Sequence, residues 1–149
     1  MKKQHFLLLG ILLLSTLASF SQQPVRWSYS SKKIGDKTYE IHLKAYIEPT
    51  WHIYAQNNIE DLGVPTSVKF RINPLVAMTG NVKEVGTLKK EKVEDVGELQ
   101  FYGNEVDFVQ QVTIKGSVKT NIAGTINYQA CTDTHCLPPS TIPFSITLN

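Results

Sequence analysis

The pattern of apolar and polar residues indicates β-strands along most of the chain. From Tyr39 to Ile47, apolar residues occupy every second position, which is the spacing of side chains on one face of a strand. The segment Ser67–Ile72 repeats this alternation, and further β-rich runs follow at residues 105–114, 124–130 and 142–148. Beyond residue 21, no stretch shows the 3.6-residue apolar period of a capped helix. We therefore predict an all-β protein.

Turn signals separate these runs and indicate the architecture. Dipeptides that contain Gly, Pro, Asn or Asp stand at residues 35–36, 48–49, 73–74, 80–81, 103–104, 115–116 and 123–124. Many short strands at a spacing of roughly 8–12 residues are typical of a β-sandwich, and we predict an immunoglobulin-like one. The charge-rich segment Lys83–Asp95 favours a solvated loop or an edge strand, because edge strands are commonly guarded by lysine.

The N-terminus has the features of a secretory signal. Two lysines precede the apolar run Phe6–Leu14, and the small residues Ser19 and Ser21 stand at the positions that a signal peptidase reads. The apolar run is much shorter than the ~20 residues of a membrane-spanning helix. We therefore predict a signal peptide over residues 1–21, a single domain over residues 22–149, and export of the mature chain.

The charge of the remaining chain narrows the choice of partners. Removal of the signal takes away two of the 15 basic residues and none of the 13 acidic ones, so the net charge falls to near zero. A neutral protein is a poor match for nucleic acid or for an anionic membrane surface. We expect a soluble monomer with no membrane insertion, no cofactor and no resident metal.

The two cysteines, Cys131 and Cys136, are separated by only four residues and precede Pro138 and Pro139. In the chain-entropy model, closing a loop of about six residues stabilises a protein by roughly 2 kcal/mol, against roughly 4 for about sixty residues. A local pair in an exported protein is therefore better suited to reversible chemistry than to stapling the fold. Residues 132–135 predict a turn, so the cysteines would face each other across a hairpin, with Cα atoms about 5.5 Å apart. The two prolines suit an exposed edge.

Three segments together resemble a known family. Tyr128–Pro139, with its two cysteines and double proline, resembles the cysteine motif of the N-terminal periplasmic domain of the disulfide reductase DsbD. Gln100–Gly103 resembles the cap loop of that family, and Trp51–Tyr54 resembles an aromatic segment beside its active site. The resemblance implies an immunoglobulin-like domain that relays electrons by thiol–disulfide exchange. Its partners would be a thioredoxin-like protein or membrane disulfide reductase on one side and oxidised proteins on the other.

The resemblance also implies roles for the two cysteines and the cap. Cys136 would be the attacking thiolate that forms a mixed disulfide with the partner, and Cys131 would resolve it. The ring of Phe101 would shield the pair from the wrong thiols, with Gln100 and Tyr102 as its neighbours in the cap. Because Gly97 and Gly103 flank this segment, we expect Phe101 to lie in a loop, although a buried core aromatic also fits the sequence.

Other side chains are expected around the pair. Tyr54 and His52 would line the pocket, although a core tyrosine and a surface histidine fit the sequence equally well. His135 would favour the thiolate of Cys136 when protonated. Trp27 and Trp51 are expected in the core.

The chain departs from the family pattern in four respects. The best-known members have five residues between the cysteines, so the turn here is one residue tighter. Leu99-Gln100 replaces an acidic pair before the phenylalanine, which leaves Glu98 as the nearest carboxylate. His52 stands where the family often has tyrosine. No membrane domain or thioredoxin-like domain follows, and we therefore expect a free-standing module.

Two other classes of function remain open. Cys131, His135 and Cys136, with His52 as a further ligand, are donors that suit copper or zinc. Adjacent His135 and Cys136 are, however, awkward to converge on one ion. The chain could also be a non-catalytic β-sandwich that binds a protein or a glycan and carries a structural disulfide; the cap-like segment counts against this. A redox titration separates these classes.

Overall fold

The computed structural model describes residues 23–59 and 62–149, and the regular elements in these residues are all strands. The predicted signal peptide lies outside the described residues. The strands are β1 (Val25–Lys33), β2 (Thr38–Ile47), β3 (His52–Tyr54), β4 (Ser67–Phe70), β5 (Val76–Gly86), β6 (Lys89–Val93), β7 (Gly97–Tyr102), β8 (Glu105–Ile114), β9 (Thr120–Tyr128), β10 (Ala130–Cys131) and β11 (Ser140–Leu148). The predicted all-β class is confirmed.

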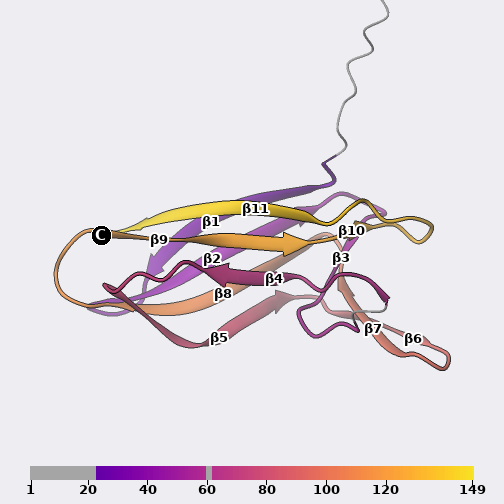
Figure 1. Ribbon diagram of the computed structural model, residues 1–149, viewed down its shortest axis with the longest axis horizontal. Helices are drawn as coiled ribbons and strands as arrows, with labels where there is room; N and C mark the ends of the chain where they lie inside the picture. The colour runs from indigo at the N-terminus through magenta and orange to yellow at the C-terminus, as the bar shows by residue number, and fades with distance from the viewer. Residues whose placement is uncertain (1–22, 60–61) are drawn as a thin grey trace, which may run out of the picture.

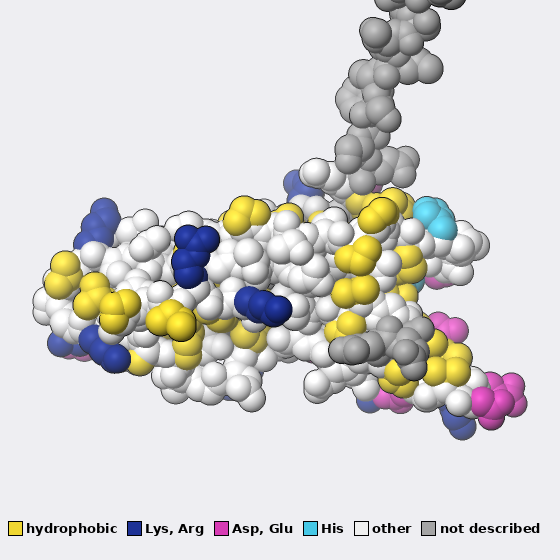
Figure 2. Space-filling view, in the orientation of Figure 1, with side chains coloured by type: hydrophobic (Ala, Val, Ile, Leu, Met, Phe, Trp, Pro, Cys, Tyr) yellow, Lys and Arg dark blue, Asp and Glu magenta, His cyan; other side chains and the backbone are white. Residues whose placement is uncertain are grey.

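Two antiparallel sheets form an immunoglobulin-like sandwich, with strand orders β1-β2-β8-β5 and β11-β9-β4. A third sheet, with the order β10-β3-β7-β6, lies at one end of the sandwich, and its β6–β7 hairpin projects outward (Figure 1). Acidic side chains gather at the tip of this projection (Figure 2). The cysteine hairpin follows β10, so it lies at the same end of the sandwich as the third sheet.

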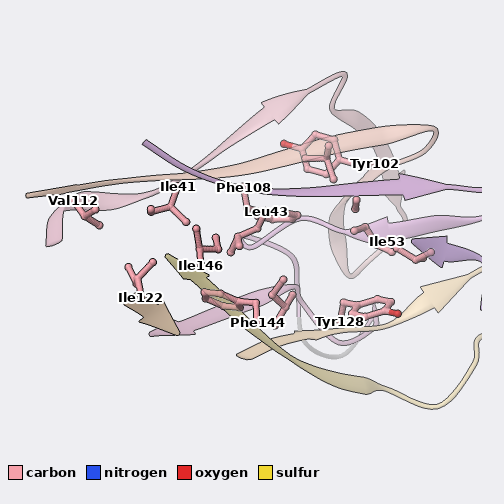
Figure 3. Close-up of a cluster of buried hydrophobic side chains, with 14 of the residues drawn as sticks. Ile41, Leu43, Ile53, Tyr102, Phe108, Val112, Ile122, Tyr128, Phe144 and Ile146 are labelled. Carbon is pink, nitrogen blue, oxygen red and sulfur yellow. The ribbon is translucent and has the colours of Figure 1, made fainter. Parts of the chain in front are cut away.

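The core follows the period-two pattern of the sequence. In β2, the five alternating apolar residues from Tyr39 to Ile47 are all buried, as predicted. In β8, Val106, Phe108 and Val112 are fully buried and lie in the same cluster as residues of β9 and β11 (Figure 3). Burial of each such side chain stabilises the fold by roughly 1.5–3 kcal/mol relative to exposure. This continuous core holds the end sheet in place.

The structure corrects three predictions of local structure. The strand predicted over Ser67–Ile72 ends at Phe70, and Ile72 is 97% exposed, because the chain turns before Pro74. The turn signal Gly80-Asn81 marks a bulge within β5, where Gly80 has a φ of 69°. Phe101 does not lie in a loop, because residues 97–102 pair with both β6 and β3 as strand β7.

The charge-rich segment Lys83–Asp95 contains the end of β5 and the whole of β6, which pairs only with β7. Of the two expectations for this segment, the edge strand is confirmed. In the part of the chain that the structure describes, no helix has the length and apolar character needed to cross a membrane.

Candidate functional site

A short hairpin places the two cysteines opposite each other. The Thr132 N–H donates to the His135 carbonyl at 2.8 Å, and the Leu137 N–H donates to the Ala130 carbonyl at 2.9 Å. These bonds flank Cys131 and Cys136, which therefore form a non-hydrogen-bonded antiparallel pair and are joined by a disulfide. Their Cα atoms are 4.0 Å apart, closer than the predicted ~5.5 Å, because pairs of this type are the narrow ones of an antiparallel ladder.

The turn of the hairpin is organised by one hydroxyl group. Thr132 Oγ1 accepts hydrogen bonds from the Thr134 N–H at 3.3 Å and the His135 N–H at 3.2 Å. The same oxygen lies 3.0 Å from Nδ1 of His135. Local bonds of this kind are typical of Ser and Thr in turns. They allow a turn of only four residues to link the cysteines.

The end sheet has one face toward the core and one toward the cysteines. Cys131 pairs with His52 across β10 and β3, and Tyr54 pairs with Phe101 across β3 and β7. Opposite residues in an antiparallel pair share a face, as do alternate residues of one strand. Therefore Cys131, His52, Tyr54 and Phe101 lie on one face, which we call the site face.

The other face of the end sheet consists of Ile53, Ala130 and Tyr102, all of which belong to the core. Figure 3 shows Ile53 and Tyr102 among the buried side chains of that cluster. The structure therefore corrects the expectation that Tyr102 lines the pocket. Its hydroxyl donates to Glu84 at 3.1 Å, and burial together with the Glu84 charge raises the pKa of Tyr102 to about 12.

Aromatic rings form the surroundings of the disulfide on the site face. The ring centroid of His52 lies 4.7 Å from that of Phe101 and 5.5 Å from that of Tyr54. The Tyr54 hydroxyl lies 3.9 Å from Sγ of Cys136. Gly63 closes over Tyr54 so tightly that a Cβ on it would collide with the tyrosine ring. The predicted pocket residues His52, Tyr54 and Phe101 are therefore brought together.

The two sulfur-bearing residues differ in accessibility. Cys131 is completely buried, whereas Cys136 is exposed. Thiol–disulfide exchange requires that the incoming thiolate reach the sulfur that it attacks. Cys136 is therefore the more accessible of the two residues to an external thiol.

The site face is uncharged near neutral pH. Burial lowers the pKa of His52 and outweighs the opposing charge of Asp133; Lys89 adds a smaller lowering effect, and Glu91 opposes it. Burial also raises the pKa of Tyr54. Both side chains are consequently neutral at pH 7, and His52 can accept a proton there.

His135 lies on the exposed turn, away from the site face. Its ring contacts Trp51 edge-on, with centroids 5.3 Å apart. Trp51 and Trp27 are partly buried and pack against the core, as predicted. Among the residues that the structure describes, no three His, Cys, Asp or Glu side chains are grouped so that they could hold a metal ion.

Glu98 and Gln100 alternate with Phe101 along β7 and therefore point to the opposite face. Glu98 accepts a hydrogen bond from Lys90 at 2.7 Å and another from Gln100 at 3.1 Å. The bond to Lys90 is the main cause that lowers the pKa of Glu98. The structure thus does not bring Glu98 or the Gln100 side chain to the cysteines.

Sequence reasoning missed two residues that build the site, Gly63 and Gln129. Gln129 accepts the Val64 N–H at 3.0 Å and donates to the Leu137 carbonyl at 3.1 Å, so it ties the cysteine hairpin to the segment beside Tyr54. The signal in the sequence that could have identified Gln129 is its position inside the cysteine motif, next to Ala130. A groove of about 750 Å³ adjoins the hairpin, lined in part by Trp27, Tyr128 and Pro138.

Comparison with known proteins agrees with this geometry. The family model of the N-terminal domain of the thiol:disulfide interchange protein DsbD matches residues 20–147. The reduced N-terminal domain of Neisseria meningitidis DsbD has a TM-score of 0.51 and 18% identity, over 81% of this chain and 85% of that one. The N-terminal periplasmic domain of ScsB from Proteus mirabilis also has a TM-score of 0.51 and 18% identity, over 83% of this chain and 44% of that one.

A further structure is the complex between the DsbD N-terminal and PilB N-terminal domains from Neisseria meningitidis. It gives a TM-score of 0.52 at 14% identity, over 83% of this chain and 82% of that one. No protein with a curated description matches the chain. The structural likenesses show the fold, and the family match covers nearly all of the described residues together with the paired cysteines. The chain therefore belongs to the family of the N-terminal domain of the thiol:disulfide interchange protein DsbD.

Proposed function

We propose that the protein is a periplasmic thiol–disulfide interchange module that passes electrons between a thioredoxin-like reductant and oxidised partner proteins. The observation that carries the proposal is the unequal exposure of a bridged pair. Cys136 is open to a partner, and Cys131 is buried directly behind it. A pair that only stapled the fold would have no need of one accessible sulfur beside a tyrosine hydroxyl.

In this function the reduced protein attacks a partner disulfide with the Cys136 thiolate. The partner's first sulfur leaves as a thiolate, and a mixed disulfide forms through Cys136. Cys131 then attacks Cys136, the partner's second sulfur leaves, and the protein retains the disulfide. Two electrons and two protons have passed to the partner. The same steps in reverse order, with the reductant as the attacking thiol, reduce the disulfide of the protein again.

The groove that adjoins the hairpin favours a protein as the partner, because aromatic and proline side chains, among them Trp27, Tyr128 and Pro138, line it. The Neisseria meningitidis relative is a DsbD N-terminal domain in complex with another protein domain, which also favours a protein partner. The signal peptide over residues 1–21, the periplasmic location and the monomeric state belong to the same proposal.

The test uses two single-cysteine variants of the mature protein and a thioredoxin-fold protein. Cys131→Ala is expected to accumulate mixed disulfides through Cys136, because the resolving thiol is missing. Cys136→Ala is expected to form few, because its remaining thiol is buried. Mass spectrometry identifies the adducts, and adducts that form only through Cys131 would contradict the assigned roles.

A redox titration against glutathione separates this function from a structural staple. The proposal expects a potential within the range of thioredoxin-like proteins. A pair that stays oxidised below about −300 mV would instead be a structural disulfide.

A further inference from the structure

The burial of Cys131 creates a chemical requirement that Cys136 does not have. Only a thiolate attacks a disulfide, and apolar burial raises the pKa of a thiol. Cys136 is exposed and can exchange its proton with water, whereas Cys131 is completely buried. For Cys131 to resolve a mixed disulfide, a base inside the fold must take its proton.

The strand register places one imidazole beside this thiol. His52 is the direct cross-strand neighbour of Cys131 on the site face. Cβ atoms of such neighbours are about 4.5–5.5 Å apart, a distance that an imidazole ring can span. Tyr54, two residues along β3, lies beside Cys136 instead.

The other ionisable groups near the hairpin are placed differently. His135 is on the exposed turn and hydrogen-bonds Thr132. Glu98 is on the opposite face of β7 and is held by Lys90. His52 is therefore the ionisable side chain that pairs with Cys131 among the described residues.

The burial and hydrogen bonding of the His52 side chain suit a general base. The residue is 9% exposed, and its ring contacts the rings of Phe101 and Tyr54. Within residues 23–59 and 62–149, neither of its ring nitrogens forms a hydrogen bond, in contrast to His42, whose Nδ1 lies 2.8 Å from Asp107. The charged groups that act on it are Asp133 from the turn and Lys89 and Glu91 from β6.

We propose that His52 is the general base that deprotonates Cys131 when the mixed disulfide is resolved, and the acid that reprotonates Cys131 when the disulfide is reduced. The inference rests on the proposed exchange function. In resolution, the Cys131 S–H proton moves to the imidazole, the Cys131 sulfur bonds to Cys136, and the bond from Cys136 to the partner sulfur breaks. The partner sulfur leaves as a thiolate, which takes up a proton from His52 or from water.

Reaction of the reduced mature protein with one equivalent of Ellman's reagent isolates this step without a natural partner. Attack by Cys136 releases the first thionitrobenzoate, and attack by Cys131 on the resulting mixed disulfide releases the second. Stopped-flow absorbance follows the two releases separately over pH 5–9.

We expect His52→Gln to slow the second release at pH 7 by about a hundredfold or more, in keeping with the usual contribution of a general base. The first release is expected to change less than twofold. In the wild type, the second rate rises as His52 loses its proton and then levels off, so the plateau is reached below the pKa of an ordinary thiol. In His52→Gln, it continues to rise toward the pKa of the buried thiol.

His42→Gln is the matched control, because it removes a histidine of β2 that hydrogen-bonds Asp107 and leaves His52 in place; both rates are expected to stay near wild type. His52→Phe keeps a ring beside Phe101 and Tyr54 and is expected to behave like His52→Gln, so it also serves if the glutamine variant fails to fold. Second rates and pH profiles equal to wild type in the folded variant would overturn the inference while leaving exchange intact. Absence of a second release from the wild type would instead contradict the proposed function.

Discussion

Truncation of Phe101 tests whether its ring shields the disulfide. Phe101 lies in β7 on the site face, opposite Tyr54 and in ring contact with His52. It is partly exposed and lies outside the core cluster. Phe101→Ala therefore removes apolar cover from the site face while leaving the core side of β7 unchanged.

The structure sets the expected magnitudes. A fully buried phenylalanine would cost roughly 3–5 kcal/mol on truncation, and a partly exposed one about half of that. The lost ring contact with His52 accounts for about 0.5–1.5 kcal/mol of this cost. If the ring adds about 1 kcal/mol to the barrier for an incoming thiol, its removal speeds reduction about fivefold. We thus expect faster exchange together with moderate destabilisation.

Stopped-flow reduction of the oxidised protein by excess glutathione measures the first effect, and a urea titration measures the second. Leu99→Ala is the matched control, because Leu99 lies on the same face of the same strand and is also partly exposed. It should destabilise the protein without accelerating reduction. A Phe101→Ala protein that is destabilised but reduced at the wild-type rate would refute the shielding argument.

Four further predictions follow from the same geometry. Tyr54→Phe should slow attack by the Cys136 thiolate a few-fold at pH 7, because the hydroxyl near Sγ no longer stabilises the anion; alkylation rates of Cys136 in a Cys131→Ala background measure this. Glu98→Gln should leave exchange kinetics within twofold of wild type, since its carboxylate faces away from the cysteines; a larger change would require a carboxylate role in the exchange. Burial lowers the pKa of His52 in the folded protein, so below pH ~6.5 the unfolded chain binds more protons than the folded one. The free energy of unfolding should therefore decrease as the pH drops through that range, and it should decrease less in His52→Gln. Melting temperatures at pH 5–7.5 test this. Gly63→Ala should lower the melting temperature and alter exchange, because its Cβ would displace the Tyr54 ring, whereas Gly35→Ala, which meets only Thr38 at 3.4 Å, should do neither.

The sequence predicted those strands whose two faces have unequal environments. In β2, buried residues alternate strictly with less buried ones, because one face lies in the core and the other does not; β8 follows the same alternation, although the polar residue Gln110 takes one of its buried positions. β3 could not be predicted in this way. Its three residues are all buried, one toward the core and two toward the aromatic layer, so no alternation is visible. Such short strands are specified by tertiary pairing and not by local pattern.

The sequence predicts which residues belong to the candidate site better than it predicts how they are arranged. The cysteine motif and the aromatic segment identified Cys131, Cys136, His52 and Tyr54 from the sequence alone. Tyr102 was assigned to the pocket because it adjoins Phe101, but adjacent residues of a strand point to opposite faces. Because Gly97 and Gly103 indicate a loop, the sequence there offers no strand period that would separate the faces of Phe101 and Tyr102. The pairing of β7 with β3 decides which of the two rings meets the sulfurs.

The chemistry of the pair depends on this same division of faces. β3 is the central link, because β10 and β7 pair with its two edges. Ile53 fixes the strand to the core, while His52 and Tyr54 meet Cys131 and Cys136 on the other side. A change in register of one residue would exchange the two faces and place Ile53 against the cysteines. The pairing of β3 with the core thus fixes which side chains surround the disulfide.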